Sequence, residues 1–355
     1  MKYIKYLLLI LFFSHWIGWF ISLCIVLLLL LTFIFKLLFV NKTKIAKKNK
    51  PIFIIIFLFL FLCVANNFNF NNTDFYFFIY QYTSLLIVII IFTSFLFENI
   101  LDFNKFSKII YWISFLTIYF EFIAVNLLKI SKDYMPAVRY EYAYYEDFLG
   151  IHRPFGLTGQ PSANGGILLF CFLLLYEFGL HNKFIITSLI IGTIMTLSGQ
   201  VVLTNFFIMF ILLFKSNFKY KLSIISLFLL FFVFIFTTEF SQKISFDYLQ
   251  YVLIDELNLN KNFSDLNIID LIFGTLGSKI SYGSEVSIIE SIRNYGIFFT
   301  LLYWSLIMYI TRTKKLNLII FIAIFLSSLH YPTIFYIEAQ IPIALIYIYN
   351  KKYNI

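Results

Sequence analysis

Long apolar blocks, each followed by a polar or charged break, run along the whole chain. The blocks predict an all-α polytopic membrane protein with about twelve transmembrane helices, because a helix that crosses a bilayer needs about 20 mainly apolar residues, or fewer where neighbours shield its ends. The expected spans are a hairpin within 4–40 that turns near 14–19, followed by 51–65, 77–97, 109–128, 164–180, 184–197, 201–214, 222–238, 295–310, 316–328 and 333–349.

Two of the breaks, 129–163 and 239–294, are much longer than the others. Counting spans from a cytoplasmic amino terminus makes both of them long outward-facing loops. No break has the composition of a separate soluble domain, so residues 1–355 are expected to form one integral membrane domain.

The positive charges support this orientation. Of the 27 Lys and Arg residues, 18 fall in breaks assigned to the cytoplasm, and Lys36 lies at a cytoplasmic helix end. The other eight all lie in the two long outer segments, which the positive-inside rule discounts. Both termini are therefore expected in the cytoplasm.

Composition excludes a soluble globular protein, since 61% of the residues are hydrophobic and only 13% are charged. The formal net charge of +9 does not indicate nucleic acid as a partner, because most of the cations lie in short loops where membrane orientation requires them. Cys24, Cys63 and Cys171 lie in apolar blocks and are expected to be small buried hydrophobic residues rather than disulfide partners or metal ligands.

Arginine is distributed differently from lysine. Three of the four arginines, Arg139, Arg153 and Arg293, lie in the outer segments. A guanidinium group is a planar, permanently charged fork that fits phosphate oxygens bidentately. External arginines therefore favour an anionic ligand such as a lipid diphosphate, and the alternative is that each pairs with a loop carboxylate.

The stretch 152–166 (HRPFGLTGQPSANGG) is the longest piece of the chain that is dominated by Gly, Pro, Thr, Ser, Asn and Gln. It lies between two hydrophobic blocks. Gly156 and Gly159 allow a tight backbone path, and Pro161 is expected to end the extended chain just ahead of the next helix. We expect Ser162 or Asn164 to cap that helix, so that its free N–H groups and Arg153 form an anion cradle. The alternative is a loop that uses Gly and Pro only to re-enter the bilayer.

The second long segment ends in a helical pattern that contains Glu290 and Arg293, three residues apart on one face, with Glu285 on a neighbouring stripe. Such a pair is either an ordinary ion pair or part of a site. His330, at the outer end of a span, and His152, beside Arg153, are candidates for proton transfer or are simply interfacial residues.

Three glutamates inside the apolar blocks are expected to face the interior of the bundle, because a carboxylate that faced lipid would be costly; they are Glu121, Glu177 and Glu338. The chain has no H-E-x-x-H motif, P-loop or Cys pair. No metal, ATP or redox cofactor is therefore expected.

This pattern resembles the membrane-embedded O-antigen and capsule polysaccharide polymerases of the Wzy type, which are related to the O-antigen ligases. The order of about twelve spans and two long outer loops is similar to theirs over most of the chain. The residues that carry the resemblance are Arg153-x-x-Gly156, Gln160–Pro161, the LSGQ turn at 197–200, Ser284–Glu285, Glu290, Gly296 and His330.

The resemblance implies a metal-independent glycosyltransferase in the bacterial inner membrane. It would transfer a glycan from undecaprenyl diphosphate to a sugar hydroxyl of the next lipid-linked repeat unit, with a chain-length regulator and a flippase as pathway partners. Arg153, Arg293 and Arg139 would hold the diphosphate, and His330 or Glu290 would be the base. The rest of the expected substrate-binding set is Gly156, Gln160, Pro161 and Glu285.

Three other functions fit the same pattern less well. A lipid-linked oligosaccharide flippase would carry polar residues through the whole depth of the bilayer, whereas here they are concentrated outside. A ligase would carry a glycine spacing that is missing here after the loop histidine. A scaffolding protein would have no use for the outer arginines.

Overall fold

The computed structural model describes residues 4–18, 21–22, 24–29, 31–32, 87–89, 102–136, 150–215, 263–275, 287–313, 315–316, 318–329 and 333–353. This part of the chain is mostly helical and contains no β-strand, which confirms the all-α expectation for it. Several expected spans, including 51–65 and 222–238, lie outside the described residues.

The helices follow the apolar blocks closely. The expected hairpin at 184–214, for example, is α8 and α9, joined at Ser198. The α-helices are α1 (Ile4–Leu11), α2 (Ser14–Ile17), α6 (Phe103–Phe122), α7 (Pro161–Glu177), α8 (Lys183–Met195), α9 (Gly199–Lys215), α14 (Ile268–Phe273), α15 (Ser287–Thr311), α16 (Ile319–Ser327) and α17 (Ile337–Tyr353). The π-helix η1 (Ile123–Leu127) extends α6, and η2 (Lys132–Tyr134) and η5 (Thr333–Phe335) are short 3-10 turns.

One helix among the described residues, Phe103–Leu127, is long and apolar enough to cross a membrane, judged by its length and composition. Four further apolar helices are shorter, at Pro161–Glu177, Lys183–Met195, Gly199–Leu212 and Tyr295–Thr311. A single helix of this kind is weak evidence for a membrane protein.

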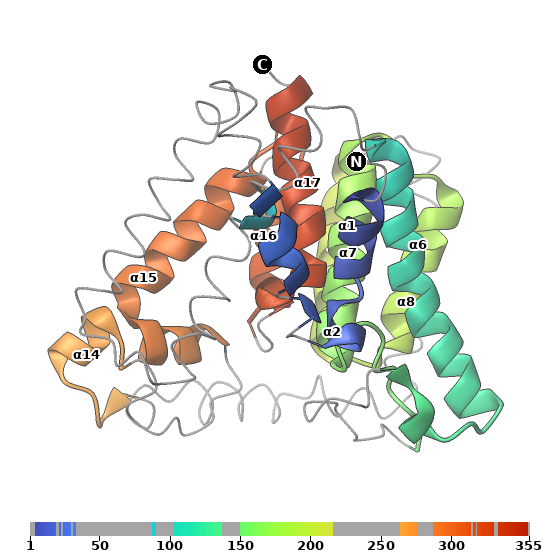
Figure 1. Cartoon of the computed structure of the whole chain (residues 1–355), viewed down its shortest axis with the longest axis horizontal. Helices are drawn as coiled ribbons and strands as arrows, with labels where there is room; N and C mark the ends of the chain where they lie inside the picture. The colour runs from blue at the N-terminus through green and yellow to red at the C-terminus, as the bar shows by residue number, and fades with distance from the viewer. Residues whose placement is uncertain are drawn as a thin grey trace.

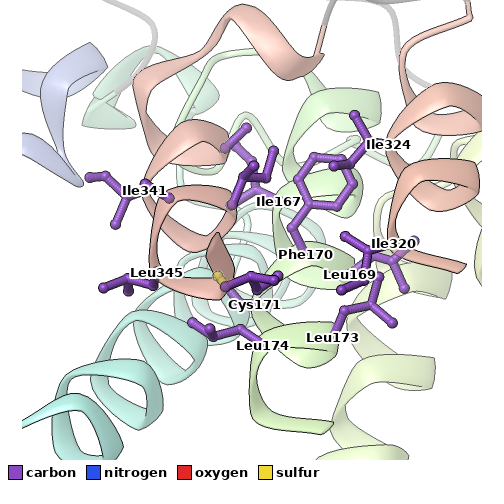
Figure 2. Close-up of a cluster of buried hydrophobic side chains, with 14 of the residues drawn as sticks. Ile167, Leu169, Phe170, Cys171, Leu173, Leu174, Ile320, Ile324, Ile341 and Leu345 are labelled. Carbon is purple, nitrogen blue, oxygen red and sulfur yellow. The ribbon is translucent and has the colours of Figure 1, made fainter. Parts of the chain in front are cut away.

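Helix α7 is the centre of the packing. Every one of its residues except Tyr176 is buried, because α6, α8, α9, α16 and α17 surround it (Figure 1). Figure 2 shows Ile167, Phe170 and Leu174 of α7 among side chains from α16 and α17. Cys171 lies in this cluster as expected, whereas Cys24 is exposed and does not fill a core position. A side chain on a helix flank that no other described element covers stays exposed however apolar its block is.

Segments assigned to the outer face gather at one end of this bundle, which we call the polar end. Four hydrogen bonds between distant parts of the chain define it: Ser14 to Glu338, Trp16 to Gly156, Ser162 to Ser198, and Gln200 to Leu326. Each joins two segments that the charge pattern places on the same side.

Segments assigned to the cytoplasm meet at the other end of α7. Phe103, Phe178 and Tyr349 form an aromatic cluster there, with ring centroids 4.0 to 6.3 Å apart. Thr313 Oγ1 donates to Glu177 Oε2 over 3.1 Å, and the Lys315 ammonium lies 4.7 Å from the Tyr176 ring centroid. The buried carboxylate of Glu177 is therefore satisfied, as expected for an interior glutamate.

His181 is stacked on Tyr176 at this end, and we expect it to make the stability of the fold depend on pH. Burial, and then the nearby Lys315 charge, lower the pKa of His181 below its usual 6.5. The unfolded chain therefore binds a proton at His181 more readily than the folded chain does. The contribution of neutral His181 to the stability of the fold is lost as pH falls below about 6.5. Thermal unfolding in detergent should show a smaller loss between pH 7.5 and 5 for His181→Gln than for the wild type. Equal losses would contradict the prediction.

Candidate functional site

The loop at 152–159, which precedes α7, is buried at every residue. Loops normally run over the surface, because their backbone N–H and C=O groups need partners. The partners of this loop are therefore the first thing to establish about it.

The first partner is the carboxylate of Glu121, from the last turn of α6. Its Oε1 accepts from the backbone N–H of Phe155 (2.6 Å), and its Oε2 accepts from the N–H of Gly156 (2.8 Å). His152 Nε2 lies 3.0 Å from the same Oε1. Glu121 and His152 are only 7% and 3% exposed, so this is a buried pair. Backbone N–H groups of the loop thus hold a carboxylate of the same chain. The anion cradle expected from Arg153 and the N–H groups at the start of α7 is a different arrangement and stays a prediction.

The second partner is Asn126, in the π-helix η1. Its Oδ1 accepts from the backbone N–H of His152 (2.7 Å), and its Nδ2 donates to the carbonyl of His152 (3.0 Å). In an α-helix, residues five apart point about 140° away from each other. The π turn bonds each N–H five residues back, so it turns Asn126 toward the face of Glu121. Both side chains can then hold the same loop.

The third partner is Asn164, and it corrects the capping expectation. Its Oδ1 accepts from the N–H groups of Leu157 (3.0 Å) and Thr158 (3.1 Å), and its Nδ2 donates to the carbonyl of Phe155. Neither Asn164 nor Ser162 caps α7. The helix already begins at Pro161, so both residues lie inside its first turn. Asn164 instead closes the loop onto the helix.

The glycines have the predicted role. Gly156 and Gly159 have φ angles of +54° and +75°, in the region that favours glycine. A Cβ on Gly156 would lie 2.5 Å from Asn164 Nδ2, so a side chain there would displace the amide that closes the loop. Trp16 also donates its Nε1–H to the carbonyl of Gly156 (2.8 Å).

Arg153, which the sequence assigned to the outer side, is buried at the polar end. It is only 8% exposed, and its Nε donates to the carbonyl of Thr196 over 3.5 Å. The reason is that the flanking residues His152 and Phe155 are both tied to Glu121, which draws the backbone between them inward.

The turn that Arg153 reaches contains the LSGQ residues, and it belongs to the same assembly. Ser198 Oγ and Ser162 Oγ, at the start of α7, are 2.7 Å apart. Gln200 Nε2 donates to the carbonyl of Leu326 in α16 over 2.7 Å. Gln160 directly precedes α7, and Pro161 is its first residue, whereas the sequence placed Pro161 just ahead of the helix.

Arg293 pairs with a carboxylate of the same chain, which was the alternative to binding an anionic ligand. Its two terminal nitrogens donate to Asp265 at 2.9 and 2.5 Å, a bidentate pair between α15 and the segment before α14. Its carbonyl accepts from the backbone N–H of Thr275 (3.0 Å). Arg293 is thus a structural link between the two helices. The ion-pair partner of Arg293 among the described side chains is the distant Asp265.

Several predicted site residues are not placed by this structure. Arg139, Glu285, His330 and the side chain of Glu290 lie outside the described residues. Among the described residues, no group of three His, Cys, Asp or Glu side chains could hold a metal ion. Asn126 was not identified from sequence. A polar residue five positions after an isolated glutamate, at the end of an apolar block, was the available signal.

Comparison of the chain with protein-family models, with curated proteins and with solved structures found no match.

Proposed function

We propose that the protein polymerises undecaprenyl-diphosphate-linked oligosaccharide repeat units into O-antigen or capsular polysaccharide. The reaction would take place at the outer face of the bacterial cytoplasmic membrane, in a multi-pass protein. The observation that carries the proposal is the placement of Arg153. A guanidinium that cannot lose its charge is enclosed at the polar end, beside the start of α7 and the LSGQ turn.

The chemistry of this transfer explains why such a residue is useful. Negative charge builds on the diphosphate as its bond to the sugar breaks, and a preorganised cation lowers the free energy of that transition state. The cation has most effect where water is excluded, because Coulombic attraction grows as the effective dielectric constant falls. A buried arginine is costly to maintain, which favours a functional role for it.

The arrangement of the polar end is consistent with a lipid-linked substrate. Segments that the charge pattern assigns to the outer face gather there, and the apolar core of α7 begins directly below. A polyprenyl carrier could lie along the helices while its diphosphate reaches the polar end from the membrane. The membrane lipid and the lipid-linked glycan are accordingly the proposed partners.

The direct test is replacement of Arg153 by alanine in the bacterium that carries the gene. Deletion of the gene should leave surface glycan with a single repeat unit, and Arg153→Ala should reproduce this at normal protein level, with transfer reduced about 100-fold or more. Gel electrophoresis of the surface glycan measures the outcome. Arg312→Ala, at an exposed arginine near the other end of the bundle, is the matched control and should leave full-length chains. Full-length chains in the deletion strain or in Arg153→Ala would refute the proposal.

A lysine at position 153 tests whether the proposed activity needs only a positive charge or also the planar guanidinium group. Arg153→Lys keeps the positive charge but loses the planar fork that binds two phosphate oxygens at once. We expect intermediate activity, with shortened chains. A fully active lysine variant would show that a point charge is sufficient.

A further inference from the structure

The contact between Glu121 and His152 determines which nitrogen of the His152 ring can accept a proton. Both carboxylate oxygens of Glu121 accept from backbone N–H groups, which is the arrangement of an ionised carboxylate. An ionised carboxylate has no proton to donate, so the hydrogen of the neutral imidazole is on Nε2 and points to Glu121. Nδ1 then carries the lone pair, on the side of the ring away from Nε2.

This arrangement is rigid on both sides of the histidine. Asn126 binds the backbone of His152 through its N–H and its carbonyl, while Glu121 fixes the ring. The ring also lies edge-on to Phe155, with centroids 4.8 Å apart. A π turn within a helix is frequently found at functional sites, and here it supplies one of these contacts. A base held by an orienting carboxylate is the usual architecture of an activated acceptor of protons.

We propose that His152 is the general base of the glycosyl transfer and that Glu121 is the residue that positions it. This inference rests on the polymerase function proposed above. It gives the acceptor hydroxyl a base on the same loop as Arg153, so the group that takes the proton and the group that stabilises the departing diphosphate are adjacent in sequence.

The step balances without any further reactant. The acceptor hydroxyl gives its proton to His152 Nδ1 while its oxygen forms a bond to the anomeric carbon of the donor sugar. The bond from that carbon to the diphosphate oxygen breaks, and its electron pair leaves with undecaprenyl diphosphate. The imidazolium is stabilised by the Glu121 carboxylate until its proton passes to the diphosphate or to water.

Among the described residues, the carboxylate of Glu121 on α6 lies 3.0 Å from Nε2 of this histidine. Other charged groups on the described segments at this end are Arg153 in the loop, Glu338 on α17, which accepts from Ser14, and Lys129, Lys132 and Asp133 after η1. Because Glu121 contacts the ring directly, replacing it is expected to change the pH dependence of the reaction.

The test measures the polymerisation rate against pH between about 5 and 8.5, a range that spans imidazole titration. Full-length protein in lipid nanodiscs would receive purified lipid-linked repeat units. The wild-type rate should rise tenfold per pH unit on the acid side and then level off. His152→Gln should lose about 100-fold or more of the plateau rate and the acid limb with it. His181→Gln, at the opposite end, is the control and should keep the wild-type profile.

The Glu121→Gln variant tests whether Glu121 positions His152, and the pH profile of its rate is the measurement. The isosteric amide removes the counter-charge of the imidazolium, so the acid limb should move to lower pH, together with a fall in rate. A residue that only held the loop would lower the rate without moving the limb.

The outcomes separate the two proposals. A wild-type protein that makes no polymer at any pH overturns the polymerase function. A polymerising wild type with a flat profile overturns the role of His152 alone, and this result needs no variant. A limb that persists in folded His152→Gln also overturns it. If that variant does not fold, an unmoved limb in Glu121→Gln is decisive against the pair.

Discussion

Replacing Glu121 by alanine is expected to lower the free energy of unfolding by about 3 kcal/mol or more, because three buried donors lose their acceptor. The change leaves the N–H groups of Phe155 and Gly156 and the ring of His152 without their acceptor in a buried loop. An unsatisfied buried donor costs about 1–3 kcal/mol, and three donors lose their acceptor together. Size-exclusion chromatography after heating in detergent would measure the loss.

Two further substitutions make this prediction specific. Glu121→Gln keeps one acceptor oxygen and should be less destabilised than the alanine variant. Glu177→Ala removes another buried carboxylate, one that accepts from the rotatable hydroxyl of Thr313 rather than from fixed backbone groups. It should lose less stability, because a hydroxyl can turn to a new partner. Equal losses for Glu121→Ala and Glu177→Ala would show that the loop does not depend on its cradled carboxylate.

The local features of the fold were predictable because each depends on neighbouring residues. The turn between α8 and α9 falls where the small residues Ser198 and Gly199 interrupt the apolar block. Gly156 and Gly159 adopt left-handed backbone angles, as the tight path required. Pro161 was expected just ahead of the helix and is instead the first residue of α7, a position that its ring favours and where its missing N–H would have no helical partner.

The contacts of the site could not be predicted, because they join residues that are distant in sequence. Glu121 was expected to face the interior, but nothing in one sequence selects the N–H groups 34 and 35 residues later as its partners. Asp265 and Arg293 are 28 residues apart, and the nearer Glu290 was the natural guess for the pair. Asn164 could have capped a helix that began later, and only the position of the helix start excludes this.

The expectation for Arg153 shows how such a contact changes a functional argument. Its position in a long polar segment assigned Arg153 to the outer side of the membrane but did not predict its burial. The side chain is buried, in a loop whose backbone binds Glu121. For the proposed diphosphate, enclosure of Arg153 would add specificity, because a buried guanidinium presents its fork in one direction. Access of the proposed substrate would then depend on the helices around the polar end.

Of the changes away from the polar end, replacement of Gly296 by alanine is expected to lower the stability of the fold most. Gly296 interrupts α15 with φ +81° and ψ 162°, a backbone conformation that is essentially limited to glycine and costs other residues about 1–3 kcal/mol. An added Cβ would also lie 2.2 Å from the carbonyl oxygen of Ile272 and 2.7 Å from the backbone nitrogen of Gly274. These are backbone atoms, so no side-chain rotation can relieve the overlap.

The matched control for this substitution is Gly179→Ala. Gly179 has a similar φ of +70°, but a Cβ there would meet no other atom within 4 Å. It therefore carries a conformational cost of about 1–2 kcal/mol without the steric one. Thermal unfolding in detergent should rank the wild type first, Gly179→Ala next and Gly296→Ala last. The steric cost should separate α14 from α15 and so weaken the Asp265–Arg293 pair. Equal stability of the two alanine variants would mean that the close crossing of α14 and α15 does not stabilise the fold.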